Sequence, residues 1–288
     1  IQDENRSRYL GDPNKYAVRY RWNYDNKIRI ALNMEKDAGE PFFREKQRYG
    51  FDYYAGHLEL DSVNKYVKKL VIGDYALQFG QGLVSWNGLS FGKGAWVGSA
   101  AKQGTGLRGY SSMNENNFQR GMSSLIQLGS IEWIPFIAYN KLSGKIIRSD
   151  SVETQITTLS QTGLNRTQTE QSYRNAIKQW VYGSHLNYRH KRLRLGLTYM
   201  HIQFDGNVVK GQAKRNAYDF EGSNLEQLGI SYQNTYRNLY FFGESAYSFN
   251  GAFATINGVI ASVTPKISMF ATYRNYAKSY HSFYAQTL

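Results

Sequence analysis

The stretch KIRIALNM, residues 27–34, alternates between apolar and polar side chains along most of its length. The apolar side chains would share one face of a strand and the polar ones the other: Ile28, Ile30, Leu32 and Met34 against Lys27, Arg29 and Asn33. Such two-residue alternation is typical of a strand that has one face against apolar material and one against water. Residues 16–24 repeat the pattern, and Asp25-Asn26 between the two stretches suits a tight hairpin turn.

Very short turns and very long connections alternate along most of the chain. Further tight turns are predicted at Gly129-Ser130, His190-Lys191, Arg237-Asn238 and Thr264-Pro265, and the long polar segments are residues 35–48, 74–120, 141–178 and 205–225. Outer-membrane barrels place short turns in the periplasm and long loops outside, whereas a soluble β-sandwich has no reason to separate them. The sequence therefore predicts an all-β protein, a transmembrane antiparallel up-and-down β-barrel of about 14 strands in the bacterial outer membrane.

Composition agrees with one barrel domain over residues 1–288. The chain has four prolines, no cysteine and no visible linker, and tyrosine (24) outnumbers phenylalanine (15), as in aromatic belts at membrane surfaces. Two strands show clear lipid-facing sets: Leu193, Leu195, Leu197 and Tyr199 in one, Ile131, Trp133, Ile137 and Tyr139 in the other. Ile1–Leu10 is a weakly patterned candidate for a fourteenth strand, and we expect the barrel to be incomplete at one or both ends if that segment is not a strand.

Residues 74–120 break the alternation. Glycine is dense there, which permits tightly folded backbone, and Phe79, Leu83, Trp86, Leu89 and Phe91 supply apolar surface to bury. We expect this loop to fold into the lumen as a constriction or plug; the alternative is a large extracellular loop with a small core of its own. Gly80-Gln81-Gly82 and Gly92-Lys93-Gly94 are interpreted as tight turns, because they lack the strand and helix context of a phosphate-binding loop.

The same region carries a resemblance. GDYALQFGQGLVSWNGLSFGK (residues 73–93) and RGYSSMNENNFQRG (108–121), followed by LSQTGLNRTQTE (159–170), FGESAYS (242–248) and YRNYAKSYHSFYA (273–285), are similar to the large outer-membrane barrels of Bacteroidota described as helix-hairpin-helix or competence-type proteins. The likeness covers the barrel portion of such proteins. It implies an outer-membrane barrel and, through the helix-hairpin-helix description, DNA as a cargo.

Candidate site residues fall into two groups. The expected anchors of the loop to the lumen wall are Asp74, Gln78, Trp86, Arg108, Asn114, Glu115, Arg120, Arg166 and Glu170. Among these, a Glu–Arg pair is expected to hold the folded loop, and Arg166 with Glu170 forms either a second such clasp or a helix start capped by Thr167. The candidate anion contacts are Arg19, Arg21, Arg29, Arg192 and Arg194 on the non-lipid face, since arginine binds phosphate through two parallel bonds.

The net charge of +13 favours an anionic partner, although the same charge could serve only to line the lumen or to grip lipopolysaccharide. Three functions are open: a plugged channel or translocon with an anionic cargo such as DNA, an accessory subunit of a larger outer-membrane secretion or assembly complex, and a barrel enzyme. No catalytic grouping is visible, and the five histidines lack metal-ligand spacing. We therefore expect a protein without enzyme activity, metal or cofactor, whose partners are outer-membrane lipid and lipopolysaccharide, DNA, or other outer-membrane proteins.

Overall fold

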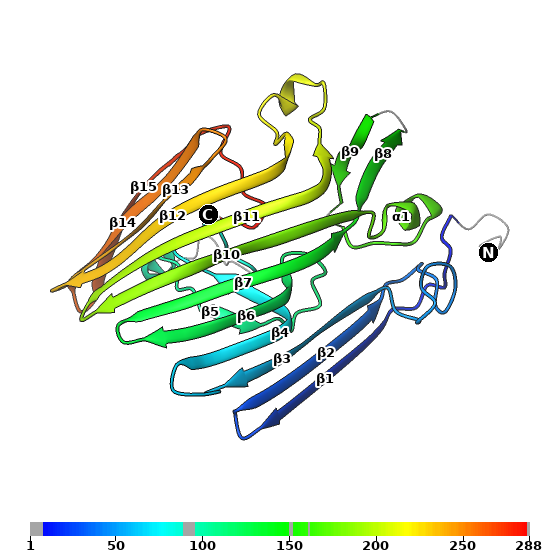
Figure 1. Cartoon of the computed structure of the whole chain (residues 1–288). Coiled ribbons are helices and arrows are strands. Elements are labelled where there is room, and N and C mark those ends of the chain that lie inside the picture. Colours follow the sequence, from blue (N-terminus) through cyan, green and yellow to red (C-terminus); the bar gives the residue numbers. More distant parts are fainter. Residues whose placement is uncertain (1–7, 89–95, 150–151, 161, 287–288) are drawn as a thin grey trace.

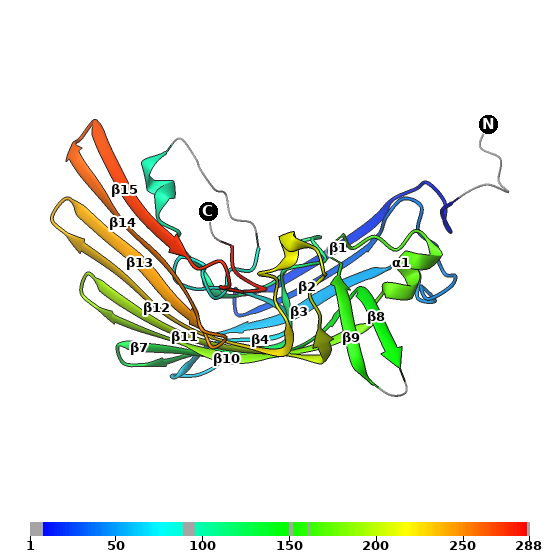
Figure 2. The same cartoon turned by 90° about the horizontal axis from the view of Figure 1, so that it is seen from above.

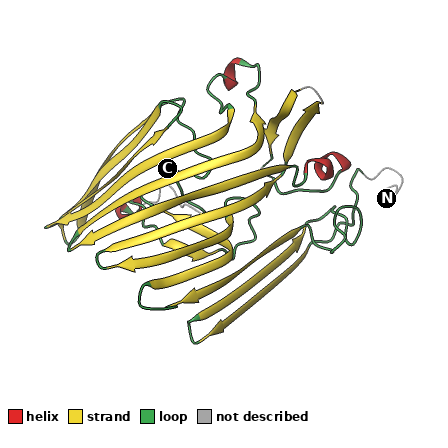
Figure 3. Cartoon of the chain, in the orientation of Figure 1, coloured by secondary structure: helices red, strands yellow, loops and turns green. Residues whose placement is uncertain are grey.

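The computed structural model describes residues 8–88, 96–149, 152–160 and 162–286, and nearly all of its regular structure is β-strand (Figure 3). The strands are β1 Tyr16–Tyr24, β2 Ile28–Lys36, β3 Tyr53–Asp61, β4 Val67–Gln78, β5 Gly106–Gly109, β6 Gln119–Leu128, β7 Ile131–Leu142, β8 Gly144–Ser149, β9 Val152–Leu159, β10 Ile177–His190, β11 Leu193–Val208, β12 Gly222–Tyr236, β13 Leu239–Ser248, β14 Ala252–Thr264 and β15 Ile267–Tyr276. The only α-helix among the described residues is α1, Gln168–Tyr173, and no helix there is long and apolar enough to cross a membrane.

Twelve of these strands form one antiparallel meander, in the order β1-β2-β3-β4-β6-β7-β10-β11-β12-β13-β14-β15 (Figure 1). The prediction of an all-β, antiparallel up-and-down sheet is confirmed. About 14 strands were expected, and the described chain has fifteen. Twelve of them form the meander, and β5, β8 and β9 lie off it. Most of the fourteenth strand expected at Ile1–Leu10 lies outside the described residues, and Tyr9 and Leu10 belong to no strand.

Tight turns join the strands at one end of the sheet, as predicted. Asp25 and Asn26 have φ of 49° and 51°, and Lys191 and Arg237 have φ of 50° and 51°. These left-handed conformations match the twist of paired strands and are tolerated best by Asn, Asp and Gly. The turns predicted at His190-Lys191 and Thr264-Pro265 are each displaced by one residue, because His190 still pairs with Leu193 and Thr264 with Ile267.

The opposite end of the sheet carries the long connections (Figure 1). The predicted loop 74–120 is shorter than expected, since β4 continues to Gln78 and β6 begins at Gln119. The segment 141–178 is not an unstructured loop: it contains the hairpin β8–β9, of which β9 pairs with β11 in parallel over two residues, and α1.

The sheet curves into a trough, and its two edge strands, β1 and β15, are not paired with each other (Figure 2). The convex face carries exposed apolar side chains in neighbouring strands, including Trp22, Ile137, Tyr182, Leu197 and Met269. The lipid-facing sets predicted in β7 and β11 lie on this face: Leu195 is 41% and Leu197 40% exposed. An apolar outer face paired with a polar inner one is the pattern of a barrel wall in a bilayer.

Candidate functional site

A loop from the long-connection end lies against the concave face of the sheet (Figure 2). Residues 79–88, the inner loop, follow β4 directly, and Leu83 and Val84 are fully buried. They join one apolar cluster with Phe136 of β7 and Ile256 of β14. The ring of Phe79 stacks on that of His185 of β10, with the ring centroids 4.1 Å apart. The inner loop therefore packs apolar side chains against the concave face of the sheet.

The C-terminal segment, residues 277–286, closes over the inner loop from the other side. The backbone N–H of Trp86 donates to the carbonyl of Tyr284 at 2.8 Å, and that of Gln286 donates to the carbonyl of Gly82 at 3.1 Å. The hydroxyl of Tyr280 donates to the carbonyl of Leu83 at 2.9 Å. Two segments about two hundred residues apart in sequence thus satisfy one another's backbone groups inside the sheet.

Glu244 of β13 anchors the inner loop. Its carboxylate is 1% exposed and accepts the backbone N–H groups of Gln81 at 2.5 Å and Leu83 at 3.1 Å. Gly80 (φ 54°) has no room for a side chain, since a Cβ there would lie 2.6 Å from Glu244 Oε2. The Gly80-Gln81-Gly82 stretch is a turn in the structure, closed by the Gly82 N–H on the Phe79 carbonyl at 3.1 Å. A buried carboxylate held by backbone donors is a charge-assisted attachment between wall and loop.

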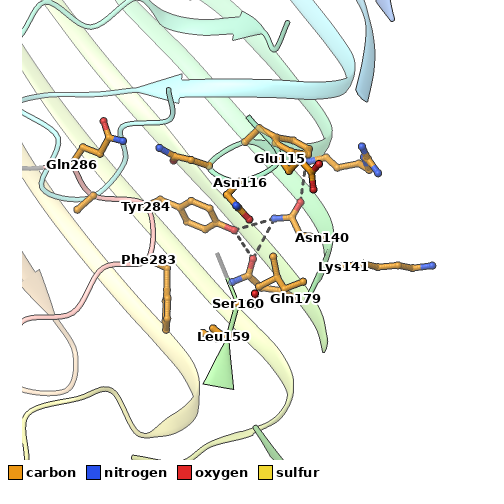
Figure 4. A pocket seen from close by; sticks show the side chains of 15 residues that line it. Glu115, Asn116, Asn140, Lys141, Leu159, Ser160, Gln179, Phe283, Tyr284 and Gln286 are labelled. Carbon is orange, nitrogen blue, oxygen red and sulfur yellow. Dashed lines mark hydrogen bonds between the residues drawn. The ribbon is translucent and has the colours of Figure 1, made fainter. Parts of the chain in front are cut away.

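A cluster of amides joins the wall to the C-terminal segment (Figure 4). Asn140 Nδ2 lies 3.0 Å from Gln119 Oε1, 3.2 Å from Gln179 Oε1 and 3.1 Å from the Tyr284 hydroxyl. That hydroxyl in turn donates to Gln179 Oε1 at 2.5 Å. Asn140, Gln179 and Tyr284 border a cavity of about 280 Å³ that Glu115, Phe118 and Arg120 also line. Because most of the buried amide atoms are paired, the cluster fixes the position of the C-terminal segment.

Two of the predicted anchors, Asp74 and Arg120, lie together in the structure, but the expected partner of the arginine was a glutamate. Arg120 lies opposite Asp74 across the β4–β6 ladder, and its Nε donates to Asp74 Oδ1 at 2.6 Å. The Glu–Arg pair expected to hold the loop is therefore an Asp–Arg pair between two wall strands, because the carboxylate of Glu115 forms no ion pair among the described residues. Gln78 does hold the loop: its Nε2 donates to the Asn87 carbonyl at 3.0 Å, and its Oε1 accepts from Thr105.

Of the other predicted anchors, Trp86 belongs to the inner loop, Arg108 to β5 and Asn114 to the loop between β5 and β6. Trp86 is buried under the ammonium of Lys102, which sits 4.6 Å from its ring centroid, while Leu89, Phe91 and the turn Gly92-Lys93-Gly94 lie outside the described residues. Arg108 lies on β5 beside Gly88, and the Asn114 carbonyl accepts the Tyr110 hydroxyl at 2.7 Å.

Of the two arrangements considered for Arg166 and Glu170, the capped helix start is present at α1, whereas the described part of the chain shows no clasp on the folded loop. Thr167 and Glu170 form a capping box, in which the Glu170 N–H donates to Thr167 Oγ1 at 3.2 Å and the Thr167 N–H donates back to Glu170 Oε2 at 3.0 Å. Arg166 Nη2 also lies 3.4 Å from Glu170 Oε1. The hydrogen bonds from the backbone N–H groups of Arg166 and Thr167, and from the Arg166 side chain, outweigh the opposing effect of burial and lower the pKa of Glu170. These residues stabilise the loop that precedes β10 and do not contact the inner loop.

The five arginines predicted to contact an anion differ in whether another group of the protein already binds their guanidinium. Arg29 is ion-paired with Glu59 and Asp61, and Arg21 donates to Asn33 Oδ1 and to the Ser111 carbonyl, both at 2.8 Å. Arg19 is exposed on β1.

Arg192 and Arg194 lie at the short-turn end of β11 and line a cavity of about 260 Å³ with Lys191. The remaining lining residues of this basic cavity are Gln103, Gln233, Thr235 and Tyr240, so no carboxylate lines it.

Glu244, the Asn140 cluster and the C-terminal segment were not predicted as parts of the site. Glu244 had a usable signal, since it is the only charged residue in β13 and the two-residue alternation places it on the face opposite Phe241 and Tyr247. Among the described residues, no three His, Cys, Asp or Glu side chains converge in a way that could hold a metal ion.

The sequence matches no known protein family and no curated protein. Three similar solved structures are outer-membrane proteins: OmpT of Vibrio cholerae with loop L8 deleted (10% identity, TM-score 0.34, covering 92% of this chain and 87% of that one), trimeric OmpT (10%, 0.36, 91% and 79%) and a mutant porin of Rh. blastica (8%, 0.30, 90% and 83%). These scores are too low to carry an argument, so the outer-membrane assignment rests on the exposed apolar face of this chain's own sheet.

Proposed function

We propose that this chain is a non-enzymatic outer-membrane barrel whose lumen is closed by the inner loop and the C-terminal segment, and that it handles an anionic cargo. The observation that carries the proposal is the packing of residues 79–88 within the trough. Buried apolar side chains, a backbone ladder to residues 277–286 and the Glu244 attachment hold it there. A surface loop would not need attachments both to the inner wall and to the C-terminal segment.

Removing the inner loop tests the closure. Gln78 of β4 pairs with Gly106 of β5, so residues 79–105 can be replaced by a two-residue Asn-Gly turn that leaves the β4–β5 hairpin intact. We expect the ion conductance of the reconstituted protein to rise severalfold. A matched control replaces Glu221, in the loop between β11 and β12, by Gln and should leave conductance unchanged. Equal conductance of the deletion variant and the unaltered protein would refute the closure.

The basic cavity at the short-turn end supports an anionic cargo. Lys191, Arg192 and Arg194 line it, and no described carboxylate forms an ion pair with any of them. Uncompensated positive charges at a channel mouth attract anions and raise their local concentration. DNA is the cargo that the resemblance to helix-hairpin-helix barrels implies, and its phosphates suit arginine.

A binding assay at graded salt concentrations tests the cargo. Phosphate contacts make affinity fall steeply with salt, with a slope that decreases by about 1 for each contact removed. We expect the double variant Arg192→Gln/Arg194→Gln to bind a DNA duplex more weakly and with a slope lower by about 2. The control Arg29→Gln removes a guanidinium already ion-paired with Glu59 and Asp61 and should change the slope little. Failure of the unaltered protein to bind DNA at low salt would eliminate DNA as the cargo.

A second candidate is an accessory subunit of a larger outer-membrane complex. Its supporting observation is the unpaired outer edge of β1, whose nine residues are all exposed in the described chain. Unpaired strand edges are not stable in hydrocarbon, because each backbone group without a partner costs several kcal/mol. Extraction of the full-length protein from its own membrane in mild detergent separates the two functions: stoichiometric protein companions favour the subunit, and a lone barrel favours the channel.

A further inference from the structure

Several connections meet at the long-loop end of the sheet. Residues 37–52 join β2 to β3, residues 110–118 join β5 to β6, and residues 162–176 lead through α1 into β10. Asn165 links two of these loops, because its backbone N–H donates to Glu40 Oε1 at 2.6 Å and its side-chain Nδ2 lies 3.4 Å from Asp52 Oδ2. Because these connections contain no strand pairing with the sheet, contacts between side chains determine how firmly the three loops are held together.

Two carboxyl groups are buried at this meeting point. Glu40 is 0% and Asp52 9% exposed, and their side chains are within hydrogen-bonding reach of each other. Asp52 Oδ1 is buried and has no donor in the structure. Two ionised carboxylates in such a position would repel each other, whereas one shared proton satisfies the unpaired oxygen and removes one charge. Burial, together with the Asp52 carboxylate, raises the pKa of Glu40 to about 8, and burial also raises the pKa of Asp52.

Glu115 brings a third carboxyl group from the loop 110–118. Its Oε2 is packed against Gly163, where a Cβ would lie 2.7 Å away, and no donor or cation among the described residues pairs with it. Burial raises the pKa of Glu115 to about 9, assisted by the charges of Asp52 and Glu40. An ionised Glu115 would lie against Gly163 without a donor or cation, so the neutral form favours the packing of its loop there.

The surrounding cations do not neutralise these groups. Arg174 donates to the backbone carbonyl of Asp52 at 2.6 Å, and Lys46 donates to the carbonyl of Gln171 at 2.8 Å. Three further cations are paired with other carboxylates: Lys15 with Glu35 and Asp37, Lys36 with Asp12, and Arg166 with Glu170. None of these five cations forms an ion pair with Glu40, Asp52 or Glu115.

We propose that Glu40, Asp52 and Glu115 form a proton-dependent clasp that holds the three loops together in acid and releases them as the pH rises. The direction follows from the pKa values. A carboxyl group with a raised pKa binds its proton more tightly in the closed loops than in the open ones. Closure is strongest below the ordinary Glu value of 4.5 and is lost as the pH rises toward 8. Within that interval the ratio of open to closed loops rises about tenfold per pH unit for each proton released.

Spin labels on two of the loops measure the opening directly. The chain has no cysteine, so Arg44→Cys and Thr169→Cys, both at exposed positions, place one label on each side of the clasp. In the full chain in detergent, we expect one narrow distance distribution at about pH 5 and a broad, longer one at about pH 9. A narrow distribution at both pH values would overturn the proposal.

Variants separate the clasp from a general effect of pH. Glu40→Gln/Asp52→Asn cannot ionise and should keep the narrow distribution at both pH values, whereas Glu45→Gln, exposed on the same loop, should behave as the unaltered protein. A pH response that survives in the double variant, or disappears in the control, contradicts the clasp. Should the double variant not fold, Glu115→Gln gives an independent test, because removing one proton must make the response less steep.

Discussion

Residues 193–200 of β11 and residues 79–86 of the inner loop are both rich in apolar side chains, yet they are fixed in different ways. Each residue of the β11 stretch has a backbone partner in both β10 and β12. The inner loop has one isolated bridge, Gln78 with Trp86, and otherwise depends on buried side chains and on the C-terminal segment. In the wall, each residue is held by two neighbouring strands, so the loss of one contact leaves the others in place. The position of the inner loop depends on only a few contacts.

Of the changes considered, replacing Glu244 by Leu should most strongly loosen the inner loop relative to the wall. The change leaves the backbone N–H groups of Gln81 and Leu83 buried without an acceptor, at roughly 1–3 kcal/mol each. We expect the inner loop to open while the wall remains folded. The readout is maleimide labelling of Ser85→Cys, a fully buried position, whose rate should rise more than about tenfold.

Two controls accompany that variant. Glu244→Gln keeps one acceptor oxygen and should increase the labelling rate less. Glu132→Leu alters an inner-wall carboxylate whose partners, Asn187 and Arg189, are wall residues. It should leave the labelling rate of Ser85→Cys unchanged. Similar labelling rates in the Glu244→Leu and Glu132→Leu variants would show that the loop is not attached through Glu244.

The wall and the inner loop also differ in how far sequence could predict them. Alternation in residues 27–34 identifies a strand because neighbouring side chains alone decide which face is apolar. The turn residues Asp25 and Asn26 act just as locally. Contacts such as Tyr280 with Leu83 join distant positions, and nothing in either stretch specifies the other. Arg120 illustrates the limit: a basic residue facing the interior was predictable, but its partner Asp74 follows only from the register of β4 and β6.

Placing a charge on the outer face should damage the wall and spare the inner loop. Leu197 lies on the convex face of β11, and an arginine at the middle of a barrel's lipid face costs about 2–4 kcal/mol. We expect Leu197→Arg to lower the stability against urea in lipid vesicles by that amount. Tyr236→Arg, close to the short turns, is the control and should cost about 0–1 kcal/mol, as expected near the membrane surface. Equal losses of stability in the two variants would contradict the placement of residue 197 at the middle of the membrane and of residue 236 near its surface.

Replacing Arg237 by Gly should strengthen the wall slightly. Arg237 has a φ of 51°, a conformation that costs L-residues about 1–2 kcal/mol and costs glycine little. Its guanidinium lies 5.4 Å from the Tyr236 ring centroid, and losing that contact offsets about 0.5 kcal/mol or more. Glycine also gives the unfolded chain more freedom, so we expect a net gain of about 0.5 kcal/mol in urea unfolding. Asn238→Gly is the matched control: its side chain donates to the Ser262 carbonyl at 3.0 Å, and the change should destabilise the sheet.

Labelling of Ser85→Cys should be unaffected by either change, because the β12–β13 turn shares no contact with the inner loop. An altered labelling rate would show that wall and inner loop open together, and the difference between them would then be one of geometry alone.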